Sequence, residues 1–137
     1  MSSLPRFNSA AECEAAFYEA FRNGDFPAMH HAWGADTDVI CIHPGRPPLA
    51  GRSAVMQSWQ AILESSGGVD VRFDCRRRAN DGGLAVHIGI ETIGAQDGEP
   101  ALVTVTNVYA LTEQGWRMHL HHAGPVHRGA GPRGPVH

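Results

Sequence analysis

Residues 84–123 read LAVHIGIETIGAQDGEPALVTVTNVYALTEQGWRMHLHHA. The segment contains three runs rich in apolar and β-branched residues, at 84–93, 101–111 and 116–123, and each gap between them carries a glycine. Tight turns between antiparallel strands use the backbone freedom of glycine. A fourth run, 69–78, precedes them and is followed by Asn80-Asp81-Gly82-Gly83. The second half of the chain is therefore predicted to be an antiparallel meander.

Helical signals occupy the first half of the chain. Ser9-Ala10-Ala11-Glu12 has the spacing of a capping box, and apolar residues then recur at helical intervals to about Asn23. Gly24 favours the left-handed turn that ends a helix, and Asp25 can cap a second helix. A third helix is expected over 53–64. Helices first and strands second predict an α+β fold, in which three N-terminal helices pack on a curved antiparallel sheet.

Length and composition limit the class of protein. The chain has 137 residues, of which 42% are apolar, so a single domain with its own core is expected. A net charge of -3 gives no basic field for nucleic acid, and three widely spaced cysteines predict no disulfide framework. No stretch approaches a membrane span and no apolar leader is visible, so we expect a cytoplasmic protein without a membrane partner.

The domain boundaries follow from composition. We expect an N-terminal extension at 1–8, one folded domain at 9–124 and a flexible tail at 125–137. The tail is rich in Gly and Pro, and such a composition buries too little apolar surface to become ordered.

The last predicted strand separates its side chains by alternation. Regular alternation places two groups on opposite faces: Trp116, Met118, Leu120 and His122 on one, and Arg117, His119 and His121 on the other. The first group is apolar apart from its histidine, so that face is expected to point to the core. An imidazole in an apolar wall needs a partner, a ligand or a shifted pKa. His122 is therefore a candidate residue for an interior site.

Several short motifs, in this order, resemble the SnoaL-like branch of the nuclear transport factor 2-like superfamily. They are Gly24-Asp25, Trp33, His43-Pro44-Gly45, Gly51-Arg52, Trp59 and the strand Trp116 to His122. The resemblance covers roughly 10–124 and implies a cystatin-like, cone-shaped α+β barrel, with a pocket between the helices and the concave sheet face and a homodimer through the sheet. The superfamily includes ketosteroid isomerases, polyketide cyclases, dehydratases and proteins without catalytic activity, so the fold leaves the function open.

The comparison with ketosteroid isomerases gives one candidate residue and one mismatch. Their carboxylate base precedes a proline at the end of the first strand, and the matching residue here is His43. An imidazole can perform the same proton transfer near neutral pH. Their donor tyrosine matches Phe17, which has no hydroxyl, and Tyr18 is predicted to point elsewhere, about 100° further around the helix. A steroid isomerase is therefore not expected.

Three functional hypotheses follow. In the first, a small apolar carbonyl compound is isomerised, cyclised or dehydrated without an organic cofactor. His43 would transfer the proton, assisted by His122. The expected ligand-binding residues are Trp33, Trp59, Asn107, Tyr109 and Trp116. In the second hypothesis the protein is a non-catalytic ligand-binding or dimerisation module, in which the same histidines are structural.

The third hypothesis is a metal-binding protein. His119-x-His121 would place two imidazoles on one strand face, although a third ligand is not evident. A second metal cluster, of His43, His122 and Glu91, requires all three side chains to face inward. His87 and Glu91 share a strand face and would form either an acid–base pair or an interfacial hydrogen bond. Which sheet face they occupy, together with Asn107 and Tyr109, stays open at this stage.

Overall fold

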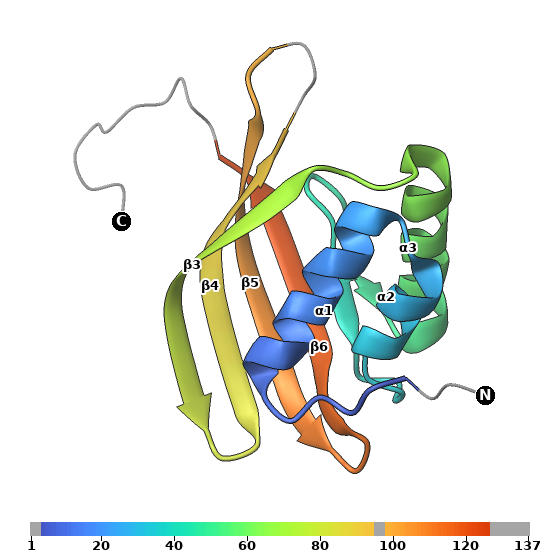
Figure 1. Cartoon of the computed structure of the whole chain (residues 1–137), viewed down its shortest axis with the longest axis vertical. Coiled ribbons are helices and arrows are strands. Elements are labelled where there is room, and N and C mark those ends of the chain that lie inside the picture. The colour runs from blue at the N-terminus through green and yellow to red at the C-terminus, as the bar shows by residue number, and fades with distance from the viewer. Residues whose placement is uncertain (1–3, 95–97, 127–137) are drawn as a thin grey trace.

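Three helices cover one face of a six-stranded sheet in the computed structural model, which describes residues 4–94 and 98–126 (Figure 1). The elements are α1 (Ala10–Asn23), α2 (Phe26–Ala32), β1 (Ile40–Ile42), β2 (Leu49–Ala50), α3 (Arg52–Ser66), β3 (Val71–Asp81), β4 (Leu84–Ile93), β5 (Ala101–Thr112) and β6 (Gly115–Pro125). The strand order is β2-β1-β6-β5-β4-β3. The predicted α+β fold, with three helices before the meander and packed on a curved sheet, is confirmed.

The predicted helix ends are confirmed by their capping contacts. The Ser9 hydroxyl accepts from the Glu12 amide at 3.1 Å, which begins α1. Gly24 has φ 65° and ends that helix in the left-handed region. The Asp25 carboxylate then accepts from the Ala28 amide at 3.1 Å and begins α2. These contacts are local, so the sequence pattern alone identifies them.

The sheet differs from the predicted one at its β1 edge. β1 pairs with β6 in parallel, through Ile40 with Leu120 and Ile42 with His122, so the sheet is not wholly antiparallel. Leu49 and Ala50 form the short strand β2, which pairs antiparallel with β1 and which we did not predict. Two prolines precede these residues, and β2 begins directly after them. The edge strands β2 and β3 do not pair with each other, so the cone stays open.

A bulge in β6 overturns one prediction. The register passes from Val108 opposite Leu120 to Tyr109 opposite Met118, which leaves His119 without a partner residue. An extra residue in a strand interrupts the alternation of side chains. His121 is therefore buried at 2% exposure and His122 is exposed. The prediction that His122 faces the apolar interior is wrong.

The N-terminal segment packs on the domain. Phe7 is buried, and its carbonyl oxygen accepts from the Trp116 amide at 3.0 Å. Arg6 donates to the carbonyl oxygen of Glu113 at 2.7 Å, so the described part of the expected extension is fixed to the β5–β6 hairpin. Of the predicted tail at 125–137, only Pro125 and Val126 are among the described residues. No helix within the described ranges is long and apolar enough to cross a membrane.

Aromatic rings fill the space between the helices and the concave face of the sheet. Phe17 of α1 makes edge contacts with Trp33 and Trp59, at centroid distances of 6.4 and 5.4 Å. None of the three is more than 1% exposed. Large aromatic side chains dominate the apolar burial of a core. This part of the interior is therefore packed by protein side chains.

Candidate functional site

A hollow of about 320 Å³ lies beside the end of β1. The loop between β1 and β2 supplies one wall and α3 supplies the other, with the lining residues His43, Arg46, Pro47, Leu49, Ser58, Ala61 and Ile62. Most of these side chains are apolar, and they are joined by one imidazole, one guanidinium and one hydroxyl. A concave, mostly apolar hollow with a few polar groups is the usual form of a small-molecule site.

Hydrogen bonds determine which nitrogen of His43 carries the proton. The Ser58 hydroxyl donates to the carbonyl oxygen of Val55 at 2.7 Å, within α3. His43 Nε2 lies 3.0 Å from the same hydroxyl oxygen. A hydroxyl has a single proton to donate, so Nε2 is the donor to Ser58 Oγ. The neutral ring then keeps its lone pair on Nδ1, which is the atom able to accept a proton.

The surroundings of His43 favour its neutral form. Burial, and then the charge of Arg46, lower the pKa of His43 below its ordinary value of 6.5. Trp59 packs edge-on against the imidazole, at a centroid distance of 5.1 Å. Cys41 Sγ lies 3.5 Å from His43 Nε2, and burial raises the pKa of this thiol to about 12. Cys41 is therefore a neutral thiol and no nucleophile at neutral pH.

A second polar group lies deeper, between α1 and the concave sheet face. Tyr18 of α1 donates to Glu91 Oε2 at 2.7 Å, and Asn107 Nδ2 donates to the Tyr18 oxygen at 3.0 Å. Asn107 Oδ1 lies 2.6 Å from His121 Nδ1, which must be the donor because an amide oxygen only accepts. His121 Nε2 faces Glu91 Oε2 at 3.9 Å. The four side chains, from α1, β4, β5 and β6, form one buried network.

Burial keeps this network uncharged in mildly acidic solution. It raises the pKa of Glu91 to about 7, and the hydrogen bond from Tyr18 opposes that rise. It lowers the pKa of His121 to about 3, with smaller effects from His43 and His122. Burial also raises the pKa of Tyr18 well above 10. Between these values Glu91 holds its proton and His121 is neutral.

The structure gives the surroundings of two groups singled out from the sequence. Tyr18, predicted to point in a different direction from Phe17, is 3% exposed and donates to Glu91. His87 and Glu91 do face the concave side, but they do not form a pair, because each bonds a different residue of α1. Asn107 and Tyr109 also face this side, and both are fully buried.

The expected ligand-binding side chains lie in the core. Trp33, Trp59, Asn107, Tyr109 and Trp116 border neither the hollow beside His43 nor the larger one described next. Their contact with a ligand stays a prediction, and Trp59 meets the first hollow only through its packing on His43. Among the described residues no group of three ligating side chains includes His119, His121, His43 or His122. The two metal clusters considered from sequence therefore do not assemble here.

A larger hollow, of about 440 Å³, lies on the outer side of the helices. It is formed by the N-terminal segment, α1 and α2, and its walls include Ala15, Ala16 and Ala28. Its titratable side chains are Glu12, Glu19, Asp25 and His31, at or near the protein surface. It contains no buried proton acceptor. The smaller hollow beside His43 is therefore the better candidate for chemistry.

Of the polar residues that line this hollow, His43 was proposed from the sequence as a site residue, but Arg46 and Ser58 were not. Arg46 lies in a Pro-rich loop, where no periodicity marks a site. Ser58 gave one usable signal, because it is the polar member of an otherwise apolar helical stripe that includes Val55, Trp59 and Ile62.

Residues 11–126, which are most of the chain, match the SnoaL-like domain family. This match agrees with the fold and with the order of the motifs. This chain belongs to the SnoaL-like family. A solved structure from Thiobacillus denitrificans, a proposed calcium/calmodulin-dependent protein kinase type II association domain, is 32% identical with a TM-score of 0.84. The match covers 90% of this SnoaL-like chain and 100% of that chain.

Two further structures place the SnoaL-like chain among related folds. A proposed dehydratase of the NTF2-like family from Streptomyces avermitilis is 30% identical, with a TM-score of 0.77 over 85% of this chain and 93% of that one. A ketosteroid isomerase-like protein from Erwinia carotovora atroseptica is 18% identical, with a TM-score of 0.66 over 85% and 93%, and shows the fold alone. No curated protein sequence matches the chain significantly.

Proposed function

We propose that this SnoaL-like protein binds a small carbonyl compound in the hollow beside His43 and catalyses a proton transfer on it. The observation that carries the proposal is the state of His43. Its pKa is lowered below 6.5, so the ring is neutral at neutral pH, and its Nε2 donates to Ser58. Its Nδ1, the remaining acceptor, lies 4.0 Å from Cys41 Sγ, and the residue lines a hollow that also contains a guanidinium. A general base needs a lone pair and a pKa near or below the working pH.

The chemistry follows from the two polar groups of the hollow. His43 Nδ1 takes a proton from the carbon next to the carbonyl group, and the electron pair of the broken C–H bond moves to the carbonyl oxygen. Arg46 stabilises the negative charge of the resulting enolate. The imidazolium then returns the proton to another carbon, which is an isomerisation, or to a departing hydroxyl group, which is a dehydration. In a cyclisation the enolate carbon attacks a second carbonyl of the same molecule, and the imidazolium gives its proton to the alkoxide that forms.

Other residues support this arrangement without reacting. Ser58 is a positioning residue, because its oxygen fixes the tautomer of His43. Trp59 limits the rotation of the imidazole by packing against it. His122 has no part in the proposal, since it is exposed on the opposite face of the sheet from the core. The 30% identity to a proposed dehydratase is consistent with this class of reaction.

The test is exchange of the proton next to a carbonyl group, followed by NMR in D₂O with a panel of small cyclic and β-hydroxy ketones. Wild-type protein should accelerate exchange for some members, and the rate should fall as the pH drops through the pKa of His43, below 6.5. His43→Ala should fold and lose about 100-fold or more of the rate. His30→Ala, an exposed histidine outside the hollow, is the matched control and should keep it.

Three results would contradict the proposal. One is wild-type protein that accelerates no exchange in the panel. Another is a His43→Ala variant that exchanges at the wild-type rate. The third is a His122→Ala variant that loses the rate while His43→Ala keeps it. If His43→Ala is merely unstable and wild-type protein is inactive, the non-catalytic module becomes the better account.

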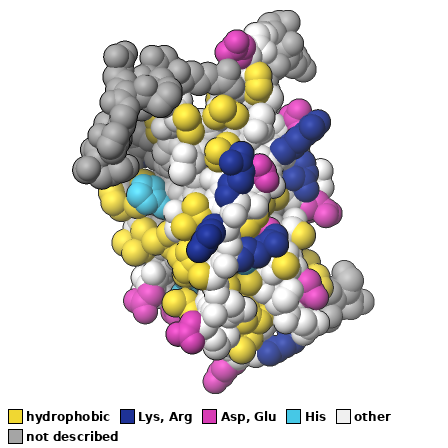
Figure 2. Space-filling model, turned by 90° about the vertical axis from the view of Figure 1, so that its left-hand side faces the viewer, with side chains coloured by type: hydrophobic (Ala, Val, Ile, Leu, Met, Phe, Trp, Pro, Cys, Tyr) yellow, Lys and Arg dark blue, Asp and Glu magenta, His cyan; other side chains and the backbone are white. Residues whose placement is uncertain are grey.

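We also propose a homodimer through the outer face of the sheet. Apolar side chains and arginines share this face in Figure 2, and Leu84 and Ile88 of β4 are 48% and 40% exposed. They alternate with inward-facing residues such as His87, so they point away from the helices. Light scattering should give twice the chain mass of 14.7 kDa for wild-type protein. Ile88→Arg should give a monomer, and a monomeric wild-type protein would contradict the proposal.

A further inference from the structure

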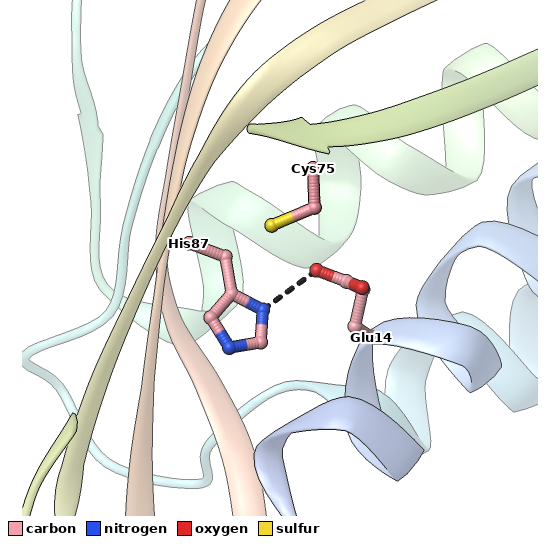
Figure 3. Close-up of side chains that lie close together, drawn as sticks. All are labelled: Glu14, Cys75 and His87. Carbon is pink, nitrogen blue, oxygen red and sulfur yellow. Dashed lines mark hydrogen bonds and ion pairs between the residues drawn. The ribbon is translucent and has the colours of Figure 1, made fainter. Parts of the chain in front are cut away.

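Three side chains with metal-binding atoms meet at the opposite side of the interior from His43. Glu14 of α1, Cys75 of β3 and His87 of β4 point toward one another in Figure 3. One ligand atom from each lies within 4.8 Å of the other two. His87 Nδ1 and Glu14 Oε1 are 2.7 Å apart, and the side chain of His87 is 4% exposed. The group lies outside the site proposed above and includes no residue of it.

The fold brings these side chains together by a local irregularity in β3. The register passes from Cys75 opposite Gly89 to Arg77 opposite Ile88, so Arg76 is an extra residue. Gly89 permits the close approach of the two strands, because a Cβ at this position would lie 2.9 Å from the Cα of Cys75. Bulges commonly redirect a side chain. Here the bulge and the glycine leave the thiol of Cys75 on the same side of the sheet as His87.

A nearby hydroxyl has no partner in the protein. Tyr109 is fully buried, its ring lies 5.0 Å from that of His87, and its oxygen forms no hydrogen bond with any described residue. Asn107 is a polar neighbour, but no hydrogen bond to it meets the usual geometry. Glu14 and Cys75 are both electrostatic neighbours of this hydroxyl. A buried hydroxyl without a partner is costly, and a bound water or ion would satisfy it.

We propose that Glu14, Cys75 and His87 bind one Zn²⁺ ion. Zinc takes a thiolate, an imidazole and a carboxylate in tetrahedral geometry, and this combination of sulfur, nitrogen and oxygen suits zinc better than calcium or magnesium. A water molecule would be the fourth ligand and would hydrogen-bond the Tyr109 hydroxyl. The Cys75 thiol releases its proton to solvent on binding. The remaining proton of His87 then lies on Nε2, which leaves Nδ1 free to bind the ion.

Binding requires a rearrangement of the thiol and a smaller change at Glu14. Cys75 Sγ now donates to the carbonyl oxygen of Arg77 at 3.4 Å and lies within 4.8 Å of the other two ligand atoms, whereas tetrahedral zinc places sulfur and nitrogen about 3.5 Å apart. Tetrahedral bond lengths of about 2.0 Å to nitrogen and oxygen place those two atoms about 3.3 Å apart, slightly further than the present hydrogen bond. Glu14 can make this change because its side chain is long and its other oxygen, Oε2, already lies 3.6 Å from Arg78 Nη2. Arg78 would keep that oxygen while Oε1 binds the ion. Such partners of a ligand orient it and raise the affinity.

The test uses cobalt as a spectroscopic substitute for zinc. The full-length chain is purified without a histidine tag, treated with a chelator and titrated with Co²⁺. A thiolate ligand gives a sulfur-to-cobalt absorption band in the near ultraviolet, and a four-coordinate ion gives strong visible bands. Wild-type protein should show both, saturating at one equivalent. Cys75→Ser should lose the ultraviolet band, and His87→Gln should weaken cobalt binding about 100-fold or more.

The controls separate this site from the other histidines and cysteines. Cys41→Ser removes the other thiol that lies beside a histidine, and it should keep the full spectrum. Replacement of His127 and His137 by glutamine removes two tail histidines and should also leave the band unchanged. Added Zn²⁺ should raise the melting temperature of wild-type protein. This measurement does not require any variant to fold.

Several outcomes would overturn the proposal. They are a wild-type spectrum without the thiolate band, a melting temperature unaffected by Zn²⁺, a band that survives Cys75→Ser, or a band that is lost with Cys41→Ser. None of these measurements uses the proton-exchange assay. Failure of the zinc site would therefore be distinguishable from failure of the function proposed for His43.

Discussion

Replacing Glu91 by glutamine should change how the stability of the fold depends on pH. Burial raises the pKa of Glu91 from 4.5 to about 7, so the folded protein holds a proton that the unfolded chain has released. The stability from this group is complete below pH 4.5 and is lost as the pH rises through 7. His121 acts in the opposite direction. Its pKa falls from 6.5 to about 3, so its contribution is present above pH 6.5 and is lost as the pH falls toward 3.

The two contributions oppose each other in the wild-type protein. Each changes the free energy of unfolding by about 1.4 kcal/mol per pH unit between pH 4.5 and 6.5, with opposite sign. From pH 5 to pH 8 the Glu91 contribution falls and the His121 contribution rises, each by about 2–3 kcal/mol. In Glu91→Gln only the second change remains. The variant should therefore gain about 2–3 kcal/mol relative to wild type over this range.

The assay is urea unfolding followed by tryptophan fluorescence at pH 5, 6, 7 and 8, at constant ionic strength. Differences between two proteins at several pH values cancel the contributions of the other titrating groups. Glu113→Gln, an exposed carboxyl in the β5–β6 turn, is the control and should follow the wild-type profile. A difference between Glu91→Gln and wild type that stays constant from pH 5 to pH 8 would refute the argument.

Three further substitutions test the packing. Tyr18→Phe removes the hydroxyl that donates to Glu91 and should cost about 1–3 kcal/mol in urea unfolding, whereas a loss below about 0.5 kcal/mol would show that the network adds little. Gly68 and Gly82 both have positive φ, but only at Gly68 would a methyl group overlap the carbonyl oxygen of Arg22. Gly82→Ala should therefore cost about 1 kcal/mol, and Gly68→Ala clearly more, in thermal unfolding; equal losses would contradict the close contact.

Local signals explain why the helices were predictable. Ser9 and Asp25 cap helices through hydrogen bonds that span three residues, and Gly24 supplies a left-handed turn. Such signals are complete within a few positions of the sequence. The meander was predictable for a similar reason, because each turn carries its own glycine. His43 could be proposed from the sequence because it precedes Pro44 at the position of the base in ketosteroid isomerases, and it does line a hollow.

The side-chain directions in β6 could not be predicted from the sequence of this strand alone, because they depend on how it pairs with β5. The bulge at His119 arises from the pairing with β5, and alternation alone cannot locate an extra residue. Because of this one extra residue, His121 faces the interior and His122 does not. The rotation of Tyr18 around the helix could be predicted, but its hydrogen bond to Glu91 could not, because that partner lies on β4.

The proposed function depends most on the claim that small molecules bind beside His43 and not in the larger hollow on the helices. Backbone amide shifts in ¹⁵N-labelled protein, recorded while small ketones and carboxylates are added, test it directly. We expect saturable changes at the residues around the hollow, including Arg46, Leu49 and Ile62. Changes confined to Ala15, Ala28 and their neighbours, or no saturable change with any compound, would contradict it.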